Sequence, residues 1–157
     1  MEKSIRMTEQ TSILCQIREQ FATGEQELGT YSPLVLAYLG DCVYELIIRT
    51  MIVEKRNCAV QKLHREATWY VKAATQAALI TAVMDELTEE EEAVYRRGRN
   101  AKSHTTPKNA DLADYRKATG LEAVVGYLYL KDDEARILSL VHQGLQAIEK
   151  GENNGIH

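Results

Sequence analysis

The chain has 157 residues, of which 45% are hydrophobic and 27% charged, and a formal net charge of −4. These values are ordinary for one soluble globular domain with its own core. The three cysteines are isolated, which argues against a disulfide framework or a thiolate zinc site and favours a reducing cytosol. The N-terminus has no signal-peptide core, and no apolar run is long enough to cross a bilayer. We therefore expect a cytoplasmic protein without a membrane segment.

Apolar residues recur every three to four positions almost throughout the chain, and strand-like alternation is nearly absent. This pattern predicts an all-α fold with short connections. We expect helices over about 8–23, 33–54, 60–86, 89–99, 111–130 and 133–150. Ser32-Pro33 is a typical helix start, and Thr88 with Glu91 forms a predicted capping box. We divide the chain into an N-terminal helix and connector (1–30), a main helical domain (31–150) and a flexible tail (151–157).

Two acidic residues interrupt strongly apolar helices. Asp41 follows Gly40 in the helix that begins at Pro33, and Glu122 lies four residues before Gly126. A helix that is apolar nearly all round is expected to be buried, and a carboxylate there needs a partner, a proton or a metal ion. The two glycines would let these helices approach closely. If the helices cross there, the two acids face one another, and a hard divalent cation such as Mg²⁺ would relieve their repulsion.

Positive charge is concentrated in one stretch of this acidic chain. Residues 96–117 contain seven bases and only two acids, which gives this stretch a local charge of +5. The bases are Arg96, Arg97, Arg99, Lys102, Lys108, Arg116 and Lys117. Such a cluster is typical of a surface that meets phosphates. The alternative is a solvated face that complements a helix C-terminus, which accounts for the three arginines but not for Lys102 and Lys108.

Three separated motifs resemble the ribonuclease III family, and specifically its Mini-ribonuclease III branch. They are Leu-Ala-Tyr-Leu-Gly-Asp at 36–41, the basic segment at 96–103 with 106–109 and 115–116, and the acidic helix at 120–130. The resemblance covers residues 32–141. It implies a ribonuclease III-type catalytic domain over 31–150, with Asp41 as the catalytic aspartate and Glu122 as the essential glutamate, both binding metal.

The same resemblance implies an Mg²⁺-dependent endoribonuclease that acts as a homodimer on double-stranded RNA and leaves a 5′-phosphate. In bacteria the substrate of this branch is the precursor of 23S ribosomal RNA, and a ribosomal protein is a candidate further partner. Two departures from full-length ribonuclease III stand out, because Ala37 and Thr119 occupy positions of further acids. Only a short stretch follows Lys131, so we expect the catalytic domain itself to hold the RNA through the bases at 96–117.

Other interpretations of the same residues remain open at this point. Asp41 could be a structural aspartate that bonds a helix terminus or a tyrosine. Glu45, one turn after Asp41, could orient Asp41 or a metal-bound water, or it could simply pair with Arg49. For the whole chain, the alternative function is a non-catalytic RNA-binding or ribosome-assembly module with the same fold. An all-α protein-interaction domain would leave the two acids unexplained.

Overall fold

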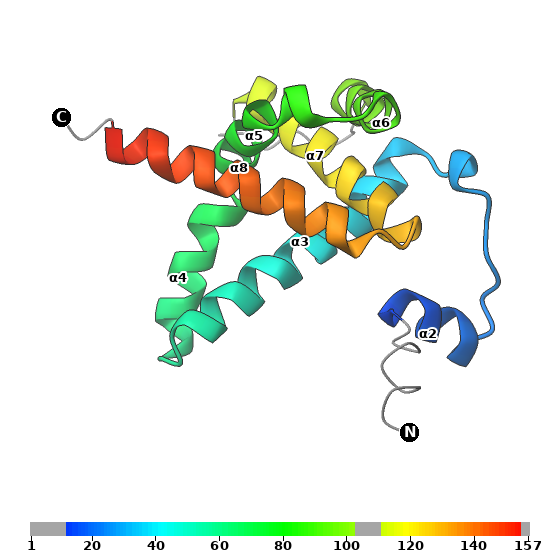
Figure 1. The fold of residues 1–157 in the computed structure, drawn as a ribbon, viewed down its shortest axis with the longest axis horizontal. Coiled ribbons are helices and arrows are strands. Elements are labelled where there is room, and N and C mark those ends of the chain that lie inside the picture. The colour runs from blue at the N-terminus through cyan, green and yellow to red at the C-terminus, as the bar shows by residue number, and fades with distance from the viewer. Residues whose placement is uncertain (1–11, 103–110, 155–157) are drawn as a thin grey trace, which may run out of the picture.

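The computed structural model describes residues 12–102 and 111–154, and every regular element in them is helical (Figure 1). The all-α prediction is therefore confirmed. The helices are α2 (Ile13–Gln20), α3 (Pro33–Lys55), α4 (Val60–Val71), α5 (Ala73–Ala82), α6 (Glu89–Asn100), α7 (Leu112–Leu130) and α8 (Glu134–Asn154). Two short 3₁₀ turns, η1 (Leu28–Thr30) and η2 (Met84–Glu86), complete the described elements. No helix in these ranges is long and apolar enough to cross a membrane.

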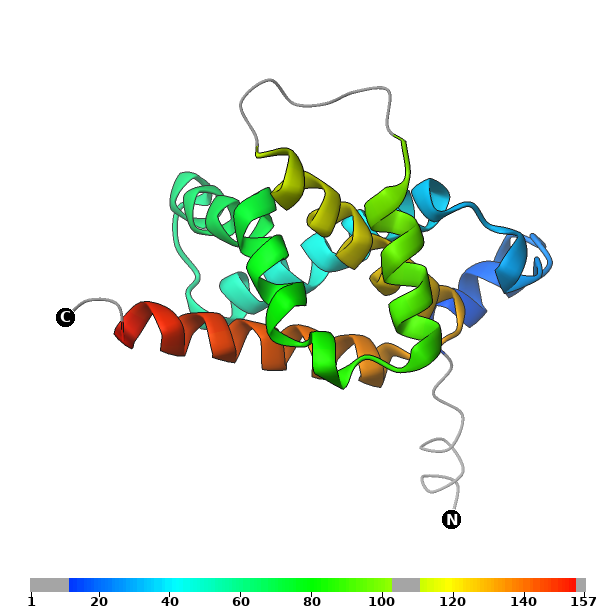
Figure 2. The ribbon, with the colours of Figure 1, turned by 90° about the horizontal axis from the view of Figure 1, so that it is seen from above.

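Helix α7 forms the centre of the domain. It packs against α3, α5 and α6, and α8 lies against α5 and α7. Figure 2 shows α7 between α5 and α6, with α8 running along one side of the bundle. Eight residues of α7 are buried, compared with six in the longer helix α3, and this burial explains the apolar sequence of α7. Because α7 touches several helices, a residue on it can meet partners from distant parts of the chain.

Local capping signals place several helix ends where the sequence predicts them. The Ser32 hydroxyl accepts a hydrogen bond from the Val35 N–H, and Pro33 occupies the first turn of α3. At α6, the Thr88 side chain bonds the Glu91 N–H while the Glu91 carboxylate accepts from the Thr88 N–H. The predicted capping box is therefore confirmed.

The prediction of a single helix over 60–86 is wrong, because the helical conformation is interrupted at Lys72. Lys72 is extended (φ −65°, ψ 151°) and separates α4 from α5, and η2 follows. Side chains of the second helix satisfy the carbonyls that end the first. The Thr75 hydroxyl donates to the Trp69 carbonyl, and the Gln76 amide donates to the Val71 carbonyl over 2.8 Å. The apolar spacing continues through this break, so periodicity alone misses it.

The two ends of the chain differ from prediction in smaller ways. Ser12 caps α2, so the described part of the first helix begins at Ile13, and the predicted start at residue 8 lies outside the described residues. Helix α8 continues to Asn154. Residues 151–154, which we assigned to the flexible tail, are therefore helical, while 155–157 lie outside the described residues.

Candidate active site

Helices α3 and α7 cross at two glycines, as the sequence predicts. A Cβ atom on Gly40 would lie 1.7 Å from the Glu122 carbonyl oxygen, and one on Gly126 would lie 1.9 Å from the Leu36 carbonyl oxygen. Any side chain at either position would therefore overlap the backbone of the other helix. The missing side chains allow contact between the two backbones, and this contact brings Asp41 next to Glu122.

The carboxyl groups of Asp41 and Glu122 meet at this crossing. Burial raises the pKa of Glu122 to about 9, and a hydrogen bond and charge repulsion with the Asp41 carboxyl add to the shift. At neutral pH and without a cation, the pair therefore holds a proton on Glu122. Two carboxyls that share a proton are the arrangement that a divalent cation relieves, because the cation replaces the proton and neutralises both charges.

The expectation that Asp41 is buried is wrong. Asp41 is exposed and Glu122 is only partly covered. Helix α3 buries one face, while the apolar side chains of the opposite face remain open to solvent. The most exposed of these are Val35, Tyr38, Leu46 and Val53, with Tyr38 at 84%. An apolar sequence on all sides of a helix does not distinguish burial within one chain from a surface that a partner covers.

The acid pair offers a cation few protein ligands. Within residues 12–102 and 111–154, no group of three or more His, Cys, Asp or Glu side chains is arranged to hold a metal ion. Two carboxylates would leave the other positions around a cation to water. This donor set fits Mg²⁺, which keeps several waters and takes one or two carboxylates at phosphate-processing sites. Thr119 shares a face of α7 with Glu122, but its hydroxyl already donates a hydrogen bond to the Tyr115 carbonyl over 3.0 Å.

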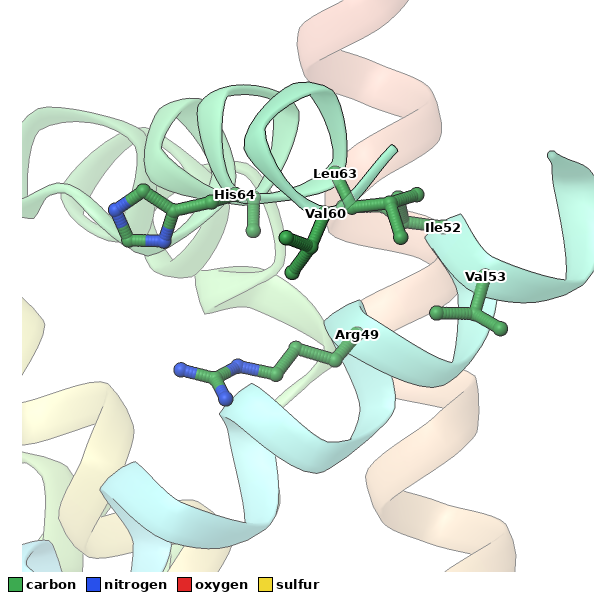
Figure 3. A pocket seen from close by; sticks show the side chains of 7 residues that line it. Arg49, Ile52, Val53, Val60, Leu63 and His64 are labelled. Carbon is green, nitrogen blue, oxygen red and sulfur yellow. The ribbon is translucent and has the colours of Figure 1, made fainter. Parts of the chain in front are cut away.

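Glu45 pairs with Arg49, one of the two alternatives that the sequence left open. The Arg49 Nη2 donates to the Glu45 Oε1 over 3.1 Å. A role of Glu45 toward Asp41 stays a prediction. Arg49 also lines one end of a cleft between α3 and α4, where its guanidinium and the His64 imidazole project to the same side (Figure 3). Apolar side chains, among them Ile52, Val60 and Leu63, form the rest of this cleft, which does not include the acid pair.

A second pair of glycines joins α6 to α7. A Cβ on Gly98 would lie 2.8 Å from the Ala123 Cβ, and one on Gly120 would lie 2.6 Å from the Tyr95 ring. This close packing fixes the C-terminal half of α6, which carries the arginines, on the helix that carries Glu122. The first part of the predicted RNA-binding stretch is thus held against the helix that carries Glu122.

The seven predicted RNA-binding bases have different surroundings. Arg96 pairs with Glu92 over 2.9 Å, and the Arg99 guanidinium lies 5.6 Å from the centre of the Tyr95 ring. Arg97, Lys102 and Arg116 are exposed, Lys117 is partly buried, and Lys108 lies outside the described residues. Their contact with RNA stays a prediction.

Sequence reasoning missed a buried ion pair. The Glu91 side chain is 4% exposed, and Arg136 of α8 donates to both of its oxygens, Nε to Oε2 and Nη2 to Oε1, at 2.9 Å each. The sequence pattern identifies Glu91 only as part of a capping box at a helix start. The capping box correctly predicts the bond of Glu91 to Thr88, but no local signal reveals a partner 45 positions away.

Comparisons with known proteins identify relatives of this chain. The Ribonuclease III domain family matches residues 34–133. A Mini-ribonuclease 3 from Clostridium tetani is 44% identical over 137 residues, which cover 83% of this chain and 91% of that protein. A Mini-ribonuclease 3 from Thermoanaerobacter sp. is 50% identical over 119 residues, which cover 76% of this chain and 84% of that protein.

A solved structure shows the same fold. A crystal structure of a protein from Fusobacterium nucleatum superposes with a TM-score of 0.68 at 30% identity, covering 72% of this chain and 92% of that one. The matched family segment contains both glycine crossings and both acids. The chain therefore belongs to the ribonuclease III family, in its Mini-ribonuclease 3 group.

Proposed function

We propose that this endoribonuclease of the ribonuclease III family cleaves double-stranded RNA with an Mg²⁺ ion held by Asp41 and Glu122. The observation that carries the proposal is the meeting of these two carboxyls at the α3–α7 crossing, where the pKa of Glu122 is raised to about 9. A structural role would call for a base or a full set of donors, and no base is among the causes that shift the pKa of Glu122.

The two acids have different surroundings and therefore different tasks. Glu122 is partly covered, and its own backbone carbonyl packs against Gly40 of α3. Glu122 therefore supplies the rigid side of the site. Asp41 is exposed and supplies the side that faces incoming RNA. Mg²⁺, when bound, lowers the pKa of a water and polarises a phosphate oxygen. Asp41 and Glu122 would hold the ion for hydrolysis of a phosphodiester, in which water adds to phosphorus, the bond to the 3′-oxygen breaks, and that oxygen takes up a proton while a 5′-phosphate remains on the other product.

The basic stretch is proposed to hold the RNA. Arg97 and Lys102 are exposed on α6 and just after it, and Arg116 is exposed near the start of α7. Together with Arg96, Arg99, Lys108 and Lys117 they would contact phosphates of an A-form duplex, which proteins recognise mainly by shape and backbone. We propose the precursor of 23S ribosomal RNA as the substrate in the cytoplasm, with a ribosomal protein as a candidate partner.

A homodimer is supported by the open apolar face of α3. Val35, Tyr38, Leu46 and Val53 form a stripe on one side of this helix, and all are at least 49% exposed. A contiguous apolar stripe on a single protomer is typical of a protein interface. Asp41 lies on the same helix, so a two-fold dimer through this face would place two acid pairs near one duplex.

The test is cleavage of a base-paired stem from a 23S precursor, with Mg²⁺ and with chelator. We expect cleavage only with Mg²⁺, and Asp41→Asn should lower the rate by about a thousandfold or more while the duplex still binds. Cleavage by Asp41→Asn at the normal rate would remove Asp41 from the site. Binding of the stem without cleavage under any metal condition would favour a non-catalytic RNA-binding module.

A further inference from the structure

Glu45 is the remaining acid on the side of α3 that carries the active site, and the mechanism above does not use it. It lies one helical turn after Asp41, so the two side chains share a face. It forms an ion pair with Arg49, another turn along the same face, and the side chains of Glu45 and Arg49 are 38% and 63% exposed. Asp41, Glu45 and Arg49 thus form a row in which Glu45 stands between the acid pair and a guanidinium.

We propose that Glu45 is a positioning residue with two alternative partners. Arg49 holds the Glu45 carboxylate when the acid pair is free of metal, and Glu45 turns toward the water shell of the cation when metal is bound. This inference rests on the proposed function, because it requires that Asp41 and Glu122 bind a divalent cation.

The balance of forces favours this exchange. An exposed Glu–Arg pair at i,i+4 contributes little to the free energy of unfolding, so breaking it costs little. A divalent cation one turn away would carry twice the charge of a guanidinium, which strengthens its attraction for a carboxylate. A cation held by only two carboxylates also keeps waters whose protons need acceptors, and Glu45, one turn after Asp41 on the same face of α3, is an acid that a hydrogen bond through such a water would use.

Arg49 has a place to lie when Glu45 leaves it. Its side chain already lines the end of the α3–α4 cleft, and its guanidinium projects alongside His64 (Figure 3). The arginine is largely exposed, so loss of its acid partner leaves it solvated and not buried with an unpaired charge. The exchange therefore requires rotation of one side chain, with no change in the helix.

The experiment is a titration of the full chain with Mn²⁺, without RNA, followed by electron paramagnetic resonance of the free ion. We expect Glu45→Gln to weaken Mn²⁺ binding about tenfold, which is typical of an acid that bonds metal-bound water. Arg49→Met should strengthen binding about twofold, because it removes the competing partner. Glu92→Gln is the matched control, since Glu92 has the same i,i+4 pairing with Arg96 on α6, and its affinity should not change.

The opposite signs of the two variants distinguish this role from a structural ion pair. Equal Mn²⁺ affinity in Glu45→Gln and the unmodified protein would overturn the proposal, as would a loss in Arg49→Met equal to that in Glu45→Gln. Thermal unfolding of each variant checks that it is folded. If Glu45→Gln does not fold, the direction of the change in Mn²⁺ affinity in Arg49→Met still tests the proposal. If the unmodified protein binds no Mn²⁺, the metal site itself is refuted, an outcome distinct from normal binding by Glu45→Gln.

Discussion

Two glutamates lie at helix contacts in this protein, and their surroundings are opposite. Glu91 is buried and receives two hydrogen bonds from Arg136 and one from the Thr88 N–H. Glu122 is partly covered, and the group it meets is another carboxyl. Glu91 lies on α6, which packs against α7, and Glu122 lies on α7 itself, so the main difference between them is the group that each one meets.

The pKa values follow from these partners. Burial by itself would raise the pKa of Glu91, but the bonds and charge of Arg136, with those of Thr88, outweigh it and the pKa is lowered. At Glu122, burial and Asp41 act in the same direction, and the pKa is raised to about 9. A buried acid whose donors are complete holds the structure together, whereas an acid left facing another acid is available to bind a cation. The predictions below test this contrast, beginning with the largest expected effect.

The close crossing that creates the acid pair should tolerate no side chain. Gly40→Ala places a Cβ 1.7 Å from the Glu122 carbonyl oxygen, and backbone cannot move aside as a flexible side chain can. We expect a loss of more than about 3 kcal/mol in the free energy of unfolding, measured in urea. Gly29→Ala is the matched control, because its Cβ would have nothing within 4 Å, and should change stability little. A Gly40→Ala protein as stable as the control would show that the helices can separate.

Removal of Arg136 from its ion pair with Glu91 should also lower the free energy of unfolding. Arg136→Met leaves the Glu91 carboxylate buried without a counter-charge, and we expect a loss of about 3 kcal/mol. The estimate is toward the lower end for buried pairs because the Arg136 side chain is 27% exposed. Lys131→Met, which removes an exposed pair with Glu90, should leave the melting temperature unchanged. Similar melting temperatures for both variants would mean that Glu91 does not need its arginine.

The acid pair should behave in the opposite way, so that replacing the titratable carboxyl of Glu122 by an amide stabilises the metal-free protein above the unfolded pKa. The folded-state pKa of Glu122 is about 9, above the unfolded value of about 4.5, so the folded state binds the extra proton. Stability is therefore full below pH 4.5 and falls as pH rises toward 9. Glu122→Gln should gain at least about 1 kcal/mol at pH 8 and nothing at pH 4.

Melting temperatures across this pH range, with and without Mg²⁺, check the prediction for Glu122. Mg²⁺ should restore the stability of the unmodified protein at pH 8 and leave Glu122→Gln unchanged. A decrease in the stability of Glu122→Gln at pH 8 would mean that its carboxylate has a partner that the structure does not show.

The smallest effect is expected from acid titration of Glu91. Its folded-state pKa lies below the unfolded value, so the ion pair stabilises the protein above the unfolded pKa, and this contribution is lost as pH falls through the folded pKa. Melting temperature should therefore fall below about pH 4. Glu91→Gln should be less stable at neutral pH and should show a shallower decrease in acid. If the melting temperatures of Glu91→Gln and of the unmodified protein fall in parallel in acid, the loss of stability comes from other carboxylates.

Local signals in the sequence determined much of this fold. Ser32-Pro33 and Thr88 with Glu91 mark helix starts through bonds that span three residues, and such bonds form wherever those residues occur. The glycine pairs were informative for a similar reason, since a missing side chain at Gly40 and Gly126 has few uses in a helix other than close approach. Motif order then connected Asp41 with Glu122.

The tertiary structure decided what depends on distant partners. It broke the helix at Lys72, where Thr75 and Gln76 bond the carbonyls that end α4. It buried Glu91 by supplying Arg136, and it left Asp41 and one apolar side of α3 exposed. Residue type and spacing report the energetic needs of each side chain, but burial and pairing depend on which surfaces meet, and only the assembled helices determine that.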